Sequence, residues 1–170
     1  MFCSLLEKWR GTNKPHTMES FPMTRWLAIS NRENSDISIK KNIWGVPKRA
    51  INTITRVKPG DTILMYVSQK IVNKEVFPSA ITGEFEVASE VYEDSSRIFI
   101  TPVKLGNELF PLRVKLKPIT IFKEPVEFKP LVPKLQFITN KKMWVGHIRG
   151  QAMRKIPEED YHLIINQASR

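Results

Sequence analysis

The stretch RWLAISNREN, residues 25–34, decides how the chain folds, because it joins a buried strand directly to a helix start. Residues 25–30 form a short apolar run, which is typical of a strand buried in a sheet. Asn31 and Asn34 follow at once, and either can cap the first turn of a helix through its side-chain oxygen. We therefore expect a strand over residues 25–30 and a helix that reaches about residue 42.

Outward from this stretch, further strand signals follow. Residues 62–68 read TILMYVS, a β-branched and aromatic run typical of a central strand, and they come after the turn KPGD at 58–61. Residues 80–88 predict another strand, in which Gly83 indicates a bulge or a barrel corner. Strand character also marks residues 97–100 and 112–117, and the second of these alternates cleanly between apolar and basic side chains.

The rest of the chain predicts helices and irregular structure. Residues 50–57 are amphipathic, and Pro157 followed by three acids is typical of a helix start, since acids favour the positive end of the helix dipole. We expect a loop over 43–47, a polar loop that ends at Pro78, irregular chain punctuated by prolines after Pro118, and a loop or edge strand over 141–149. Strands with helices near both ends predict an α+β fold, a small curved sheet or open barrel.

The composition suits a single globular domain. The chain has 170 residues, of which 41% are hydrophobic and 26% charged. No run of about 18 apolar residues occurs, so we expect no membrane-spanning helix. The single cysteine, Cys3, cannot form an intrachain disulfide, which points to a reducing, cytoplasmic compartment. Residues 1–22 show no sustained period and precede another methionine, Met23, so we expect a loosely ordered tail over 1–22 and a domain over 23–170.

Charge is the first functional signal. Lys and Arg number 27 against 17 Asp and Glu, a formal net charge of +10. Two segments, residues 37–60 and 128–157, contain no acid. This balance favours partners that carry phosphates, because lysine and arginine release counterions from polyanions; a lysine-rich soluble protein without such a partner is the simpler alternative. The candidate phosphate-binding residues are Lys40, Lys41, Lys48, Arg49, Lys142, Arg149 and Arg154.

Motifs for catalysis or metal binding are scarce. The sequence has no GxSxG, P-loop or HExxH motif, and its three histidines, His16, His147 and His162, have no cysteine or carboxylate at ligand spacing. We expect no metal, no cofactor and no enzymatic activity. An enzyme acting on a nucleobase or nucleoside would have to use Lys48, Glu33 or His147.

Aromatic side chains beside cations support a binding function better. Trp44 lies in a predicted loop flanked by lysines, and an exposed indole beside cations is suited to stacking a base while the phosphates are held. The alternative is that Trp44 packs onto the first strand. Trp26 is expected in the core, and Trp144 resembles Trp44 in context. Asn31 and Asn34 either cap the helix or read a base edge.

Several short stretches, taken in order and spacing, resemble the EVE domain. They are WLAISNREN (26–34), IWGVPK (43–48), RVKPGD (56–61), EVYED (90–94) with Arg97, PLRVK (111–115) and GQAMRKIPEEDY (150–161). The resemblance covers residues 23–170. It implies a PUA-like fold, that is, a curved mixed β-sheet or open pseudo-barrel with flanking helices. It also implies kinship with YTH domains, which hold N6-methyladenine of RNA inside an aromatic cage.

The resemblance further implies the residues of a base pocket. YTH sequences carry a Ser-Asn-x-x-Asn element after the first strand and a tryptophan at the end of the next helix. These positions fall on Ser30, Asn31, Asn34 and Trp44, and Gly45 follows directly. Trp44 would then form one wall of the pocket, with both asparagines close to the base edge.

The opposite wall departs from the YTH pattern. Residues 94–102, where YTH domains place a second cage tryptophan, hold Phe99 and no tryptophan. Phe99, Tyr66 and Trp144 are the candidates for this wall. We therefore expect a module that holds a flipped and modified base, in single-stranded RNA rather than DNA. Two alternatives stay open: a non-selective RNA-binding PUA-like module, and an enzyme acting on a nucleobase or nucleoside.

Overall fold

The strand and helix predicted from residues 25–34 form as expected. The computed structural model describes residues 22–169, so residues 1–21 of the predicted tail lie outside the described chain. Within it, β1 spans Arg25–Ser30 and α1 spans Arg32–Lys41. The Asn31 side-chain oxygen accepts a 2.8 Å hydrogen bond from the Asn34 amide and so caps the helix. Asn42 ends α1 in the left-handed region, at a φ of 54°.

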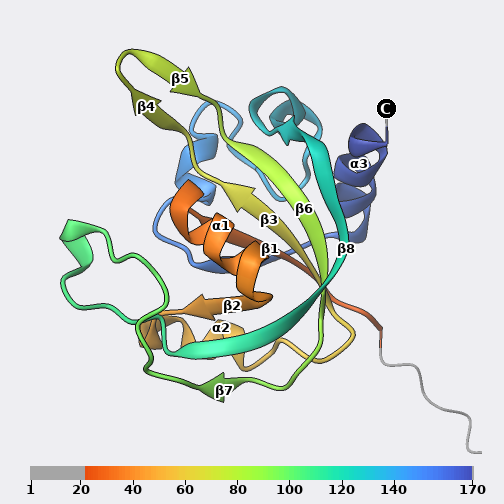
Figure 1. Ribbon diagram of the computed structural model, residues 1–170. Coiled ribbons are helices and arrows are strands. Elements are labelled where there is room, and N and C mark those ends of the chain that lie inside the picture. The colour runs from red at the N-terminus through yellow and green to blue at the C-terminus, as the bar shows by residue number, and fades with distance from the viewer. Residues whose placement is uncertain (1–21, 170) are drawn as a thin grey trace, which may run out of the picture.

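One curled, mixed sheet carries the molecule. Its strand order is β2-β8-β6-β3-β1-β9, with β7 paired to β8; β1 and β3 run parallel and the other neighbours antiparallel. The further strands are β2 (Ile43–Val46), β3 (Thr62–Val67), β6 (Ala80–Val87), β7 (Tyr92–Glu93), β8 (Leu112–Glu127) and β9 (Met153–Ile156). A separate hairpin consists of β4 (Lys70–Val72) and β5 (Glu75–Phe77), and the further helices are α2 (Ile51–Ile54) and α3 (Glu158–Ala168). Figure 1 shows a half-barrel with α1 in its opening and α3 beside β8, which confirms the predicted α+β class.

The sheet is buried on both faces, because alternate residues of its strands enter two different cores. Along β1, Leu27 joins the core beneath α3, whereas Trp26 and Ala28 join the core that contains Trp44. The same alternation in β3 sends Leu64 to the first core and its neighbours to the second. This period of two explains why these strands read as continuous apolar runs.

Three predictions about strands are wrong. Residues 43–46, predicted as a loop, form β2, which pairs with β8. The predicted polar loop contains the β4–β5 hairpin, whose turn places Asn73 and Lys74 at positive φ, as a type I′ turn requires. Residues 97–100, predicted as a strand, form none. Their backbone pairs instead with a side chain of α1, described below.

The long strand β8 also overturns a prediction. The chain after Pro118 was expected to be irregular, yet β8 continues through Pro118 and Pro125 to Glu127. Its pairing with β6 shifts register between Glu84 and Phe85, next to the position opposite Pro118. Such irregularities accept a residue that lacks an N–H donor. The predicted bulge near Gly83 is confirmed by a second register shift.

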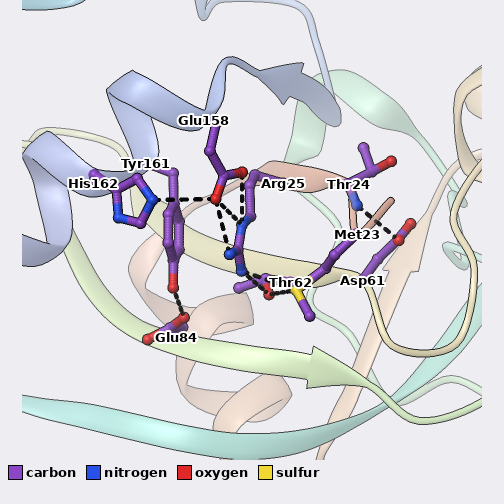
Figure 2. A network of polar contacts seen from close by, with 9 residues as sticks. All are labelled: Met23, Thr24, Arg25, Asp61, Thr62, Glu84, Glu158, Tyr161 and His162. Carbon is purple, nitrogen blue, oxygen red and sulfur yellow. Dashed lines mark hydrogen bonds and ion pairs between the residues drawn. The ribbon is translucent and has the colours of Figure 1, made fainter. Parts of the chain in front are cut away.

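A polar network closes the end of the sheet where β1 begins (Figure 2). The Arg25 guanidinium bonds Glu158 at 3.0 Å and Thr62 at 2.7 Å, and lies 3.8 Å from the centre of the Tyr161 ring. The Tyr161 hydroxyl donates to the buried carboxylate of Glu84. Burial, together with this hydrogen bond, raises the pKa of Tyr161 to about 12. The network ties α3 to β1 and β6.

Two features are absent from residues 22–169. No helix in this part of the chain is long and apolar enough to cross a membrane. Nor do three or more His, Cys, Asp or Glu side chains gather there in a group that could hold a metal ion.

Candidate functional site

A cavity of about 180 Å³ opens where β1 ends, α1 begins and β2 passes beneath a long loop. We call it the Trp44 cavity. The structure brings together six of the predicted pocket residues in its lining, namely Ser30, Asn31, Asn34, Trp44, Gly45 and Phe99. They come from four segments of the chain, so only the folded sheet assembles them.

Trp44 is a wall of this cavity and not the exposed platform that the sequence suggested. It keeps only 4% of its surface exposed and belongs to the same core as Trp26. Its backbone pairs with Val114 of β8, and the ring packs in the core that also contains Val114. The expectation of an open indole is therefore wrong, but the ring still lines a cavity rather than being sealed on every side.

Gly45 allows the opposite wall to approach β2 closely. A Cβ at this position would lie 2.7 Å from Cε2 of Phe99 and 2.9 Å from the Phe110 carbonyl oxygen, closer than such atoms can pack. Phe99 and Phe110 in turn meet edge to face, with ring centres 5.7 Å apart. The second aromatic wall is thus Phe99, with Phe110 packed against it.

The two asparagines have different tasks. Both polar atoms of the Asn34 side chain bond the backbone of Ile100: the nitrogen donates to the carbonyl at 2.8 Å, and the oxygen accepts from the N–H at 2.7 Å. Asn34 therefore positions the loop that carries Phe99. Asn31 uses its side-chain oxygen for the helix cap, while its NH₂ group has no hydrogen-bond partner within residues 22–169. Asn31 is the amide that remains available to a ligand.

We call residues 94–111 the wall loop, and a buried arginine holds its two ends together. Arg113, 0% exposed, donates to the Ser96 hydroxyl at 2.9 Å and to the carbonyls of Phe110 at 3.0 Å and Leu109 at 3.1 Å. It also lies 3.3 Å from the Asp94 carboxylate. Hydrogen bonds from Ser96 and the charge of Arg113 hold the pKa of Asp94 below its ordinary value. The aromatic wall thus stands on a fixed base.

Arg49 is the cation that reaches the cavity. It lines the cavity and donates to the Gly150 carbonyl at 3.0 Å, which brings together the two acid-free segments, 37–60 and 128–157. Arg149, the neighbour of Gly150, and Lys142 are exposed on the second segment. A positive rim beside the cavity is therefore available to an anionic strand.

The other predicted phosphate ligands lie farther away or are engaged. Lys40 and Lys41 occupy the last turn of α1, about 14–15 Å along the helix from Asn31. Lys48 pairs with Glu93 at 3.4 Å. Arg154 donates to the His147 carbonyl at 3.0 Å, lies over the Phe137 ring, and is partly desolvated, which lowers its pKa.

Two predicted wall residues and the candidate catalytic residues lie outside the cavity lining. Tyr66 and Trp144 both pack against Phe128 in the other core. Glu33 pairs with Lys70, and this hydrogen bond lowers the pKa of Glu33. Lys48 is held by Glu93, as above, and the ring nitrogen of His147 accepts a 3.2 Å bond from the Asn140 amide.

Sequence reasoning missed several lining residues. Pro102, Leu105 and Phe110 come from the wall loop, and Gln151 comes from the segment before β9. The loop has no periodicity that would reveal it, but Gln151 falls within the GQAMRKIPEEDY stretch and so carried a signal. The whole cavity is smaller than the ~300–1,000 Å³ of sites for drug-sized ligands, so it suits one flat ring rather than a whole nucleotide.

Comparison with known proteins gives a consistent result. A family model described as the EVE domain matches residues 24–167. A UPF0310 protein of Pyrococcus abyssi is 53% identical over 142 residues, which cover 84% of this chain and 97% of that protein. A UPF0310 protein of Pyrococcus horikoshii is 50% identical over 143 residues, with the same two coverages, 84% and 97%.

Solved structures share the fold at lower identity. Human THYN1, in complex with DNA that contains 5-methylcytosine, has a TM-score of 0.58 at 16% identity and covers 86% of this chain and 98% of its own. The Pho92 YTH domain, in complex with m6A, has a TM-score of 0.56 at 12% identity and covers 87% of this chain and 84% of its own.

Proposed function

The chain belongs to the EVE domain family, and from this we propose that it binds nucleic acid and holds one extruded, modified base in the Trp44 cavity. Two proteins of the same fold support this proposal, because human THYN1 was solved with 5-methylcytosine DNA and the Pho92 YTH domain with m6A. What their ligands have in common is a base that carries a methyl group. We propose a ligand of that chemical class here.

The observation that carries the proposal is the cavity itself. Trp44 and Phe99 form two aromatic walls of a space sized for one flat ring, and Asn31 offers a donor at its side. Arg49 adds a cation at the same place. Aromatic walls hold a base through its π-face, an amide reads its polar edge, and a cation holds the adjoining phosphate.

Energetics favour an unpaired target. Stacking on an aromatic wall contributes about 1–3 kcal/mol per base, whereas extracting a base from a duplex costs a few kcal/mol. These terms nearly cancel, so we propose single-stranded or already unpaired sites. Unpaired loops and ends are the usual targets in RNA, and for this reason we favour RNA over DNA.

Selectivity for a modified base must come from a close fit. Burying one methyl group contributes only about 0.8 kcal/mol, which is about fourfold in affinity at ~1.36 kcal/mol per decade. Phe99 packs closely against Gly45, which keeps this wall rigid. A rigid wall is needed to separate a modified base from an unmodified one by more than this factor. Arg49, Lys142 and Arg149 would supply the affinity that does not depend on the base.

The test compares oligonucleotides that differ in one central base. Fluorescence anisotropy titrations would use unmodified, 5-methylcytosine and N6-methyladenine strands, as RNA and as DNA, against the wild type and Trp44→Leu. The variant keeps an apolar side chain but removes the aromatic face, so affinity for the preferred modified strand should fall about 10- to 100-fold. Selectivity over the unmodified strand should fall with it.

Trp144→Leu is the matched control, since Trp144 packs in the other core and should leave binding unchanged. Equal affinity for modified and unmodified strands, unaltered by Trp44→Leu, would contradict the base-pocket proposal. That result, with a steep dependence on salt, would instead identify a non-selective nucleic-acid-binding module.

A further inference from the structure

The tip of the wall loop, residues 102–107, projects into solvent beside the Trp44 cavity. Val103 is 99% exposed, which is unusual for a valine, and Leu105 is 44% exposed while also lining the cavity. Val103 is therefore only two residues from the cavity wall. The tip therefore presents an apolar side chain to solvent next to the cavity. Such an arrangement is typical of a surface that contacts a partner.

The tip stands on a rigid stem. Arg113 clamps the loop at Ser96 and at Leu109 and Phe110, as described above. Inside this clamp the Thr101 hydroxyl donates to the Glu108 carbonyl and closes the neck of the tip. A side chain on a short, closed loop is held ready to insert into a partner and need not be ordered by it.

The charges around the tip favour an anionic partner. Both acids of the wall loop are engaged within it: Asp94 with Arg113 and Ser96, and Glu108 with the Phe110 amide at 2.9 Å. Lys104 and Arg97, the two exposed cations of the loop, form no ion pair within residues 22–169. The apolar tip is thus flanked by free positive charge, which suits a nucleic-acid strand.

We propose that Val103 is a wedge that enters the base stack when the neighbouring base moves into the Trp44 cavity. This inference rests on the proposed function. Two residues of chain span at most about 7 Å, and stacked bases lie about 3.4 Å apart along a strand, so Val103 is within reach of the gap that an extruded base leaves. Apolar side chains inserted between base steps are a known way to hold nucleic acid in such a distorted form. Lys104 then lies next to the backbone at the same step.

The experiment separates the wedge from the pocket by using two probes. One is a 12-base-pair duplex with a single central 5-methylcytosine or N6-methyladenine opposite an abasic site, so that the target base is already unpaired, prepared as RNA and as DNA. The other is the corresponding free nucleoside, which has no neighbouring bases to stack. Val103→Ser should weaken binding of the preferred duplex about tenfold, because the wedge loses its apolar contact, and should leave nucleoside affinity within about twofold.

Two variants control the measurement. Val103→Leu keeps an apolar wedge and should bind the duplex as the wild type does. Ile119→Ser also replaces an exposed aliphatic residue, 51% exposed on β8 and outside the cavity lining, and should change neither affinity. Wild-type duplex affinity in Val103→Ser, or an equal loss for the nucleoside, would overturn the wedge.

Failure of the wedge and failure of the pocket give different results. Trp44→Leu should weaken both probes. If it does so while Val103→Ser binds the duplex normally, the wedge is wrong and the pocket stands. If Trp44→Leu changes neither probe, the proposed function fails and the wedge fails with it.

Discussion

Trp26 and Trp44 lie in the same core, but their ring nitrogens differ in hydrogen bonding. The Trp26 ring nitrogen donates to Asp61 at 2.9 Å, and the same carboxylate accepts from the Thr24 amide at 3.1 Å and the Lys58 amide at 3.0 Å. The Trp44 ring nitrogen is buried and has no hydrogen-bond partner within residues 22–169. Trp26 is therefore part of a satisfied network, whereas Trp44 borders a space that the protein leaves unfilled.

This contrast extends to the two ends of β1. The end at Arg25 is closed by the network of Arg25, Glu158, Tyr161 and Glu84 (Figure 2), and the end at Ser30 opens into the Trp44 cavity. Under the proposed function, the closed end stabilises the fold and the open end binds the ligand. Substitutions at the two ends should then separate stability from affinity.

The largest expected difference is in stability. Trp26→Leu removes a fully buried ring and leaves the Asp61 carboxylate short of one donor, so it should lower the free energy of unfolding by about 3 kcal/mol. Trp44→Leu should lower it by about half as much, since its ring nitrogen has no bond to lose and a cavity already lies beside it. Denaturant unfolding measures both, and equal losses would break the distinction between the two tryptophans.

A smaller loss of stability is expected when the wall loop loses its contact with α1. Asn34→Leu removes both hydrogen bonds to Ile100, so the free energy of unfolding should fall by about 2 kcal/mol. Because the wall loop is then less well positioned, binding of the modified strand should weaken about tenfold. Amide exchange should speed up selectively in residues 97–108. Unchanged exchange there would show that Asn34 does not position the loop.

The network at the closed end should make the stability of the fold depend on pH in the alkaline range. Because folding raises the pKa of Tyr161 from 10.0 to about 12, its protonated hydroxyl contributes stability that is complete below pH 10 and is lost as the pH rises toward 12. Tyr161→Phe should cost about 1 kcal/mol at neutral pH and should flatten this alkaline loss. Melting temperatures across the range test this, and an equally steep decline in the variant would assign the loss to other groups. Affinity should not change.

The smallest effect concerns the cationic rim. Arg149→Gln should reduce the salt dependence of binding by about one unit of slope or less and weaken all sequences alike. The matched variant Lys123→Gln, on the part of β8 that lines a different groove, should leave the slope unchanged. A change in base selectivity with Arg149→Gln would show that this side chain reads the base.

Local sequence signals predicted the elements that local forces determine. The strand at β1, the cap at Asn31, the strand at β3 and the start of α3 after Pro157 all follow from neighbouring residues. By contrast, β2 is four residues long and exists because β8, far along the chain, supplies its partner. No local pattern encodes such a pairing, and the same holds for the continuation of β8 beyond Pro118.

The site was predictable only in part for the same reason. Family resemblance placed Ser30, Asn31, Asn34 and Trp44 together, and the structure gathers them at one cavity. The distinct task of Asn34 depends on its contact with Ile100, a residue 66 positions away. The choice of Phe99 over Tyr66 and Trp144 for the second wall depends on which core each ring enters.

The most direct test observes the indole N–H groups during binding. In ¹⁵N-labelled protein titrated with the preferred modified oligonucleotide, we expect the Trp44 side-chain resonance to shift strongly. The Trp26 resonance, fixed by Asp61, should stay in place. A complex that forms while the Trp44 signal remains unmoved, or that shifts Trp26 instead, would contradict a base held at the open end of the sheet.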